Sequence, residues 1–290
     1  MRHARLLRLL FVALFLALLI AAMWNLGFFD LTRLEKVSNL GVFLRDLFPP
    51  DPDVLGEASR ALFETVQMAF VGTALSFILA LPLGLLGARN LFGAKVTAPV
   101  RLALSVVRTV PVLLWALILV VTIGLGPLAG TIGLAIYSLG YLGKLYYEGF
   151  EAVDPEVTEA VKSVGCSKLQ LARYAIIPES ANMLLSQLLF MFEYNVRASS
   201  ILGFVGAGGI GFYMLGYIQA LQYQSLLTVI LLTLAVVLLI DFLSTKIRDR
   251  FLLTNPAQGG GLLMSLRLPK FQRRPARSRS ETVPEVVSAE

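Results

Sequence analysis

The chain alternates between long apolar runs and shorter polar connections. Each run is close to the ~20 residues that an α-helix needs to cross the hydrocarbon core of a membrane. Inside that core every backbone amide needs an internal partner, so the runs are predicted to be helical even where glycine or Pro82 interrupts them. Six spans are predicted, at Leu9–Phe29, Leu62–Ala88, Leu102–Ile123, Leu128–Tyr147, Ala181–Leu202 and Leu226–Phe242. The expected fold class is an all-α polytopic membrane protein.

Composition favours membrane spans over a soluble core. Of the 290 residues, 57% are hydrophobic and 15% are charged, against roughly 25% charged in an ordinary soluble domain. The mean hydropathy is +0.75. A single cysteine and a single histidine exclude an internal disulfide framework and a His/Cys metal site. We therefore expect no metal on this chain.

The basic residues predict how the spans are oriented. Lysines and arginines are retained on the cytoplasmic side of a membrane, and twenty of the 25 fall inside if both termini are cytoplasmic. The expected topology is therefore six spans with the N-terminus and the C-terminus inside. The net charge of +6 is interpreted as this asymmetry, with contact to membrane lipid and not to nucleic acid.

Four segments follow from these patterns. Residues 1–29 are predicted to be an N-terminal anchor span; a cleaved signal peptide is the alternative, but no convincing small-residue cleavage site follows the run. Residues 30–61 are predicted to form an outer loop, and residues 62–250 the core. Residues 251–290 are predicted to be a cytoplasmic, largely disordered basic tail that is attracted to anionic lipid, because Gly, Pro, Ser and Arg replace the apolar runs there.

Small residues recur at every fourth position of the second span. Such a row lets another helix approach closely, which is how membrane helices associate without a hydrophobic driving force. Glycine is common in membrane helices in any case, but five residues in register favour a close helix contact. The row is Gly72, Ser76, Ala80, Gly84 and Ala88.

The fifth span carries two opposite charges. Glu193 and Arg197 are four residues apart, so they share a helix face and are predicted to pair. A charge at the bilayer centre costs about 2.5–3.5 kcal/mol, so the pair is expected to face the bundle interior or a watery path. Two roles stay open: a pair that only holds helices together, and a pair on a transport path.

The connection between the fourth and fifth spans is the only sizeable polar stretch within the predicted bundle. Asp154 is a helix-capping residue and Pro155 suits the first helical position. Gly165 supplies a left-handed residue that ends the first short helix. Ser167, with Gln170, predicts a capping box for a second short helix, which Pro178 is expected to end while it starts the fifth span.

The first of these short helices carries an apolar face at spacing i, i+3, i+4, i+7. Two short helices joined at a glycine elbow form a rigid docking element. A pore needs no such device, whereas a permease driven by a separate soluble motor needs one to transmit the motor's movement. The apolar face consists of Val157, Ala160, Val161 and Val164.

This loop, residues 154–177, resembles the "EAA" loop of ABC importer permeases. The resemblance lies in Glu159-Ala160-Val161, Gly165 and Ile177-Pro178. Val161 stands where the family has alanine and Ile177 where it has leucine, both apolar exchanges that leave the helix-elbow-helix pattern intact. By this resemblance the residues that couple the spans to an ATPase are Asp154, Pro155, Glu159, Ala160, Val161, Gly165, Ser167 and Pro178.

Further short stretches resemble the permeases of phosphonate and phosphite ABC importers across about residues 57–250. They are Glu64–Met68, Leu81–Gly84, Ala88–Asn90, Arg108–Pro111, Gly143–Leu145, Glu193–Arg197 and Gly203–Gly211.

The resemblance implies a permease that carries a phosphonate- or phosphite-class oxyanion across a bacterial inner membrane. It further implies a homodimer, two cytoplasmic ABC ATPase subunits that hold ATP and Mg, and an extracytoplasmic substrate-binding protein. This chain then binds no cofactor and is not an enzyme. The alternatives are the permease of an amino-acid ABC importer and a secondary transporter acting alone; no nucleophile-base set supports a membrane-embedded enzyme.

Two motifs are misleading. Residues 206–211 match the G-x-G-x-x-G pattern of dinucleotide-binding proteins, but the preceding strand and the βαβ context are missing. A flexible break or gate is the better interpretation, so Gly206, Gly208 and Gly209 join Glu193 and Arg197 as the predicted translocation path. No P-loop pattern occurs, and energy must come from a partner. Outside these motifs, Cys166 is interpreted as a small buried thiol, and Asp241 is expected to pair locally or to reach the interface.

Overall fold

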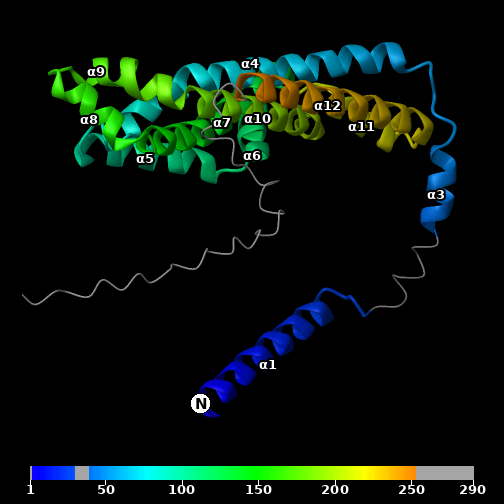
Figure 1. The fold of residues 1–290 in the computed structure, drawn as a ribbon. Helices are drawn as coiled ribbons and strands as arrows, with labels where there is room; N and C mark the ends of the chain where they lie inside the picture. Colours follow the sequence, from blue (N-terminus) through cyan, green and yellow to red (C-terminus); the bar gives the residue numbers. More distant parts are fainter. Residues whose placement is uncertain (1, 30–38, 253–290) are drawn as a thin grey trace, which may run out of the picture. The chain divides into compact units, whose positions relative to one another are not determined.

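The computed structural model describes residues 2–29 and 39–252 (Figure 1). Within these residues the regular elements are all helical, in agreement with the predicted fold class. The predicted disordered tail from residue 253 onward, and residues 30–38 of the predicted outer loop, lie outside the described part of the chain. The chain divides into two compact units, Met1–Arg248 and Asp249–Glu290, and the first contains every site described below.

The described helices vary from short turns to a helix of 33 residues. Two irregular turns, η2 and η3, interrupt the regular helices. In chain order the elements are α1 (Arg2–Asn25), α3 (Asn39–Leu47), α4 (Leu55–Gly87), α5 (Ala94–Thr109), α6 (Val112–Ile123), α7 (Pro127–Glu151), α8 (Pro155–Ser163), α9 (Lys168–Leu171), η2 (Ala172–Ile176), α10 (Ile177–Leu202), η3 (Gly203–Val205), α11 (Ile210–Gln219) and α12 (Tyr223–Leu252).

Five helical stretches in the described residues are long and apolar enough to cross a membrane, and a bent pair of helices raises the number to six if it forms one span. Helices α1, α4, α7 and α12 supply four of them. The fifth is the stretch Lys168–Val205, which contains α10. The bent pair is α5 with α6.

The third predicted span, Leu102–Ile123, is not one straight helix. It belongs to α5 and α6, which are bent by 83° at the break between them. Pro111 has no N–H to continue a helix and forces the residue before it away from helical backbone; Val110 accordingly has φ −78° and ψ 122°. The indole N–H of Trp115 donates to the Val107 carbonyl at 3.0 Å across the bend. Hydropathy measured the length of the run but not its direction.

Helix α7 runs alongside α4 and α10 (Figure 1). The five small residues of the second span are all buried, and the two glycines among them lie against α7. A Cβ on Gly72 would sit 3.0 Å from the Cβ of Leu134, and one on Gly84 would sit 2.8 Å from the Cβ of Tyr146. The separation at Gly84 is too short for a real side chain, and the one at Gly72 is tighter than nearly all real Cβ contacts, so the row sets the close approach of α4 to α7 within one chain.

A polar cluster joins the same three helices in the interior. The amide nitrogen of Asn195 in α10 donates to the hydroxyl of Thr73 in α4 and to that of Ser138 in α7, both at 2.8 Å. Asn195 and Ser138 are fully buried. Because a buried amide without partners is costly, this cluster fixes the relative positions of the three helices.

Candidate functional site: the loop between α7 and α10

The loop begins with the capped helix that its sequence predicts. A carboxylate oxygen of Asp154 accepts a hydrogen bond from the Glu156 N–H at 2.9 Å, and Pro155 opens α8. Thr158 is buried within the helix, whereas Glu159 lies on its exposed side. The side-chain cap and the proline stabilise this helix start through local interactions.

The elbow after α8 depends on glycine for its backbone conformation. Gly165 has φ +76°, and its N–H donates to the Lys162 carbonyl at 2.9 Å. A Cβ added at Gly165 would meet nothing within 4 Å. Glycine is therefore needed at this position for its left-handed backbone and not for space.

The second arm starts with the predicted capping box. The Ser167 N–H donates to the side-chain oxygen of Gln170 at 2.8 Å, and the Gln170 N–H donates to the Ser167 hydroxyl at 3.3 Å. These reciprocal bonds satisfy two backbone donors that the start of α9 leaves unpaired.

Pro178 does not end the second arm, contrary to prediction. Lys168–Val205 is one continuous helical stretch, because the turn η2 before the proline widens into a π-helix in which the Ile177 N–H reaches the Ala172 carbonyl. A widened turn accommodates a proline that cannot donate and whose ring crowds the preceding turn. The Ser180 hydroxyl bonds the Ile176 carbonyl at 2.6 Å. The arm is thereby continuous with α10.

The apolar face of α8 lies at the protein surface. Of its four residues only Val161 is half-buried, and it packs with Cys166 against the core cluster of the second arm. Val164 is 81% exposed, Leu169 is 77% exposed, and Tyr174 is 67% exposed. Apolar side chains gathered on a polar loop indicate an interaction surface.

The glycine turn after α10 is packed onto α4. The Gly209 N–H donates to a Glu64 carboxylate oxygen at 2.9 Å, and the Ile210 N–H donates to the Thr65 hydroxyl at 2.8 Å. These two side chains therefore cap the start of α11 from another helix. Gly206, Gly208 and Gly209 all have positive φ, between 73° and 82°. Their predicted place on a translocation path stays a prediction.

The predicted pair of Glu193 with Arg197 is wrong as to partners. Arg197 donates to Asp241 at 2.7 Å, and Arg248 donates to Glu193 at 2.9 Å. Asp241 and Arg248 are seven residues apart, about two turns of α12, so they meet the two charges of α10 from one face. The result is two ion pairs that link α10 to α12. Sequence spacing identified two residues on one helix face but not the neighbouring helix that competes for them.

Comparison with known proteins places this arrangement in a family. Residues 80–252 match the family described as "Binding-protein-dependent transport system inner membrane component". The chain belongs to this family. The matched region contains the whole loop, both ion pairs and the glycine turn. The members of the family are the permease subunits of transport systems, and they are multi-pass membrane proteins.

Two curated relatives show which members of the family this chain resembles. The chain is 32% identical over 248 residues to the phosphite transport system permease protein PtxC of Stutzerimonas stutzeri, covering 83% of this chain and 88% of that one. It is 39% identical over 214 residues to the phosphate-import permease protein PhnE of Mycolicibacterium smegmatis, covering 73% of this chain but 40% of that longer protein. These relatives support the resemblance to phosphite and phosphonate permeases.

A solved structure supports the same fold. The MetNI methionine ABC transporter in an inward facing conformation superposes with a TM-score of 0.62 at 24% identity, covering 69% of this chain and 98% of that one. At this identity the likeness concerns the fold of the family and not the cargo.

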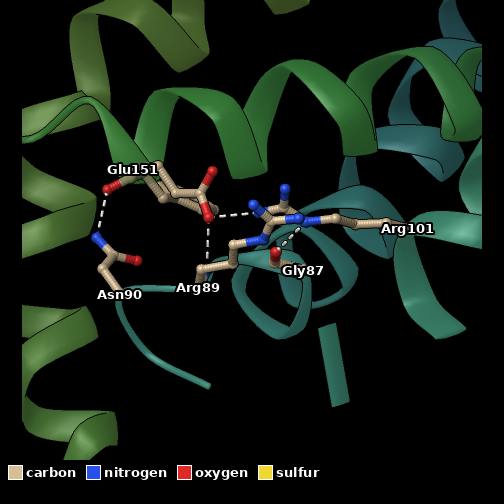
Figure 2. A network of polar contacts seen from close by, with 6 residues as sticks. Gly87, Arg89, Asn90, Arg101 and Glu151 are labelled. Carbon is tan, nitrogen blue, oxygen red and sulfur yellow. Dashed lines mark hydrogen bonds and ion pairs between the residues drawn. The ribbon is translucent and has the colours of Figure 1, made fainter. Parts of the chain in front are cut away.

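Sequence patterns missed one polar network at the base of this permease loop (Figure 2). A Glu151 carboxylate oxygen, at the end of α7, accepts from the Arg89 N–H at 2.6 Å and from the guanidinium of Arg101. Arg101 also donates to the Gly87 carbonyl at 2.8 Å. These residues lie up to 64 positions apart in the chain and follow no helical spacing, so no local signal pointed to them.

Proposed function

We propose that this chain is the membrane-spanning subunit of an ATP-driven importer whose cargo is an oxyanion of the phosphite, phosphonate or phosphate class. The observation that carries the proposal is the capped two-arm loop with its exposed apolar side chains, in a chain of the binding-protein-dependent permease family. The cargo class rests on the names of the relatives, which transport phosphite and phosphate.

The proposed partners are two ABC ATPase subunits, a second copy of this chain and a substrate-binding protein. Exposed Val164, Leu169 and Tyr174 give the ATPase an apolar surface to bind. Glu159 and Lys162 border that surface and are exposed as well, which adds polar contacts at its rim. ATP and Mg bind to the partner, because this sequence has no phosphate-binding loop of its own.

The proposed mechanism is mechanical. Closure of the ATPase pair on ATP displaces the loop, and the second arm carries the displacement into α10 because arm and span form one continuous helix. The polar cluster at Asn195 then transmits it to α4 and α7. Movement of α10 relative to the second copy opens the path toward the binding protein, and ATP hydrolysis resets it.

The proposed path runs beside the ion pairs of α10. Arg197 keeps 48% of its side chain exposed while it pairs with Asp241, and a half-exposed ion pair inside a membrane span is unfavourable toward lipid. This face of α10 therefore borders water or the second copy. Glu193 and Asp241 neutralise the two arginines, so a passing oxyanion meets the half-exposed guanidinium of Arg197 as a hydrogen-bond donor and is not held by an unbalanced positive charge.

The proposed topology has both termini in the cytoplasm of a bacterium, with the loop on the same side. It follows from the distribution of lysine and arginine.

A test uses Gly165→Pro in the complex with the ATPase subunits. Proline cannot adopt the φ of +76° that the elbow needs, so ATPase co-purification and ATP-dependent uptake of radiolabelled phosphite are expected to fall to background. Unchanged uptake and co-purification would contradict the coupling role. If the partner substrate-binding protein binds an amino acid and not an oxyanion, the alternative of an amino-acid importer is supported instead.

A further inference from the structure

The carboxylate of Glu151 lies at the root of the loop between α7 and α10. Glu151 is the last residue of α7, and only Ala152 and Val153 separate it from the capping residue Asp154. Three steps of chain span at most about 10 Å. Whatever fixes Glu151 therefore fixes where α8 begins.

Glu151 connects this root to two other helices, as Figure 2 shows. One of its oxygens accepts from the Arg89 backbone, directly after α4, and from the side chain of Arg101 in α5. Arg101 is oriented in turn by the Gly87 carbonyl at 2.8 Å and by the ring of Tyr147, whose centroid lies 4.2 Å from the guanidinium carbon. The side chains of Arg101 and Glu151 are only 19% and 27% exposed, so water screens the pair little.

The second arm of the loop rests on the same turn between α4 and α5. Lys168 lies over the ring of Phe92, with its nitrogen 5.2 Å from the centroid. Leu91 is buried in one cluster with Leu171 and Ile176 of the arm. The turn of residues 88–93 therefore contacts the loop at both of its ends.

The turn is held by polar groups that are not all paired. Asn90 donates to the Phe150 carbonyl at 2.7 Å, but within the described part of the chain its side-chain oxygen is buried without a hydrogen-bond partner. An unpaired buried acceptor raises the free energy of this conformation.

A half-buried ion pair is also a poor choice for stability alone. Its desolvation opposes its attraction, and an apolar contact of the same size fixes helices at least as well. An ion pair between a carboxylate and a guanidinium instead fixes the relative orientation of the two helices that carry it. Its hydrogen bonds form in one geometry and are lost when the two groups move apart.

We propose that Glu151 and Arg101 are positioning residues for coupling. They hold the root of the loop to α4 and α5, so that a displacement of the loop moves these helices and is not absorbed in the turn. The inference rests on the proposed function, since it requires an ATPase that displaces the loop.

The test measures uptake per ATP hydrolysed by the full complex in vesicles, with radiolabelled phosphite, methylphosphonate and phosphate as probes. Glu151→Gln keeps the size of the side chain and an accepting oxygen but removes the charge, so the bonds from Arg89 and Arg101 lose their charge assistance; uptake per ATP is expected to fall about tenfold. Glu148→Gln is the matched control, because Glu148 lies on the same helix and pairs with Lys144 at the surface; its uptake per ATP should stay at the wild-type value.

Two further variants separate positioning from folding. Arg101→Lys restores a positive charge and should recover part of the uptake per ATP that Arg101→Gln loses. The double variant Glu151→Gln/Arg101→Gln should be no worse than either single variant. The proposal is overturned if Glu151→Gln leaves uptake per ATP unchanged, or if uptake and ATPase activity fall together in proportion to the amount of complex. A wild-type complex without ATP-dependent uptake of any probe would overturn the proposed function and this inference with it.

Discussion

Of the breaks between helices that use glycines with positive φ, two are packed in opposite ways. Gly165, between α8 and α9, stands in open space. Gly208 and Gly209, between α10 and α11, are packed: an added Cβ would lie 2.8 Å from the Cα of Pro127 at one and 2.7 Å from the Thr65 hydroxyl at the other. The break at Gly165 therefore leaves room for another protein to bind, whereas the break at Gly208 and Gly209 packs against other helices of the same chain.

This difference separates two kinds of glycine that a sequence motif does not separate. The elbow at Gly165 needs glycine only for its left-handed backbone, since no other group packs within 4 Å of an added Cβ. The turn before α11 needs glycine for backbone and for space, and its backbone donors are already occupied by Glu64 and Thr65. The turn is therefore a packed joint in this conformation and not the loose segment that its glycine content indicates.

The largest expected effect is at the packed turn. Gly209→Ala combines a left-handed backbone with a clash against Thr65, and should destabilise the folded protein by about 3 kcal/mol. The measurement is thermal unfolding of the detergent-purified chain. Gly216→Ala, in α11 with nothing within 4 Å of the added Cβ, is the control and should be neutral or slightly stabilising. Equal unfolding temperatures for the two variants would contradict the conclusion that the turn at Gly209 is closely packed.

The elbow should respond less. Gly165→Ala meets no steric contact, so it costs only the left-handed backbone, about 1–2 kcal/mol, and the cost stays in the loop. Hydrogen exchange should rise in α8 and α9 while the unfolding temperature of the spans is unchanged. Asparagine adopts this conformation more readily than alanine, so Gly165→Asn should exchange more slowly than Gly165→Ala; the reverse order would argue against a backbone origin.

The sequence predicts those features that depend on interactions between residues close together in the chain. The caps at Asp154 and Ser167 and the left-handed residue at Gly165 are local, and sequence spacing located all three. The bend at Pro111 and the π-helical turn before Pro178 also follow from proline, but only the surrounding helices decide whether a proline ends a helix or bends it.

The ion pairs show the limit from the other side. Arg197 meets Asp241, 44 residues away, and Arg101 meets Glu151, 50 residues away. Each choice depends on which helices become neighbours, and no periodicity in a single segment contains that information. The row of small residues in α4 was accessible because its contact requires only one helix face, although the sequence did not identify α7 as the partner.

The capping box offers a smaller test of the loop. Ser167→Ala removes the acceptor for the Gln170 N–H and should cost about 1 kcal/mol of local stability. Hydrogen exchange at residues 168–171 should then rise several-fold. Ser163→Ala is the control, because that hydroxyl only bonds the Ala160 carbonyl of its own helix; a similar rise there would remove the special role of the box.

The smallest expected effect is at Glu64. Glu64→Gln retains an oxygen that accepts from the Gly209 N–H and loses only the charge at the start of α11, worth about 0.5 kcal/mol. The unfolding temperature should fall by a degree or two at most. A loss as large as that of Gly209→Ala would mean that the carboxylate charge, and not close packing, holds the turn.

The central claim is that the loop between α7 and α10 transmits the movement of a separate ATPase. The most direct measurement is uptake of radiolabelled phosphite by vesicles that contain the chain and its binding protein, with and without the ATPase subunits. The account predicts ATP-dependent uptake only when the ATPase is present. Uptake at the same rate in vesicles that lack it, driven by a solute or ion gradient, would contradict the account.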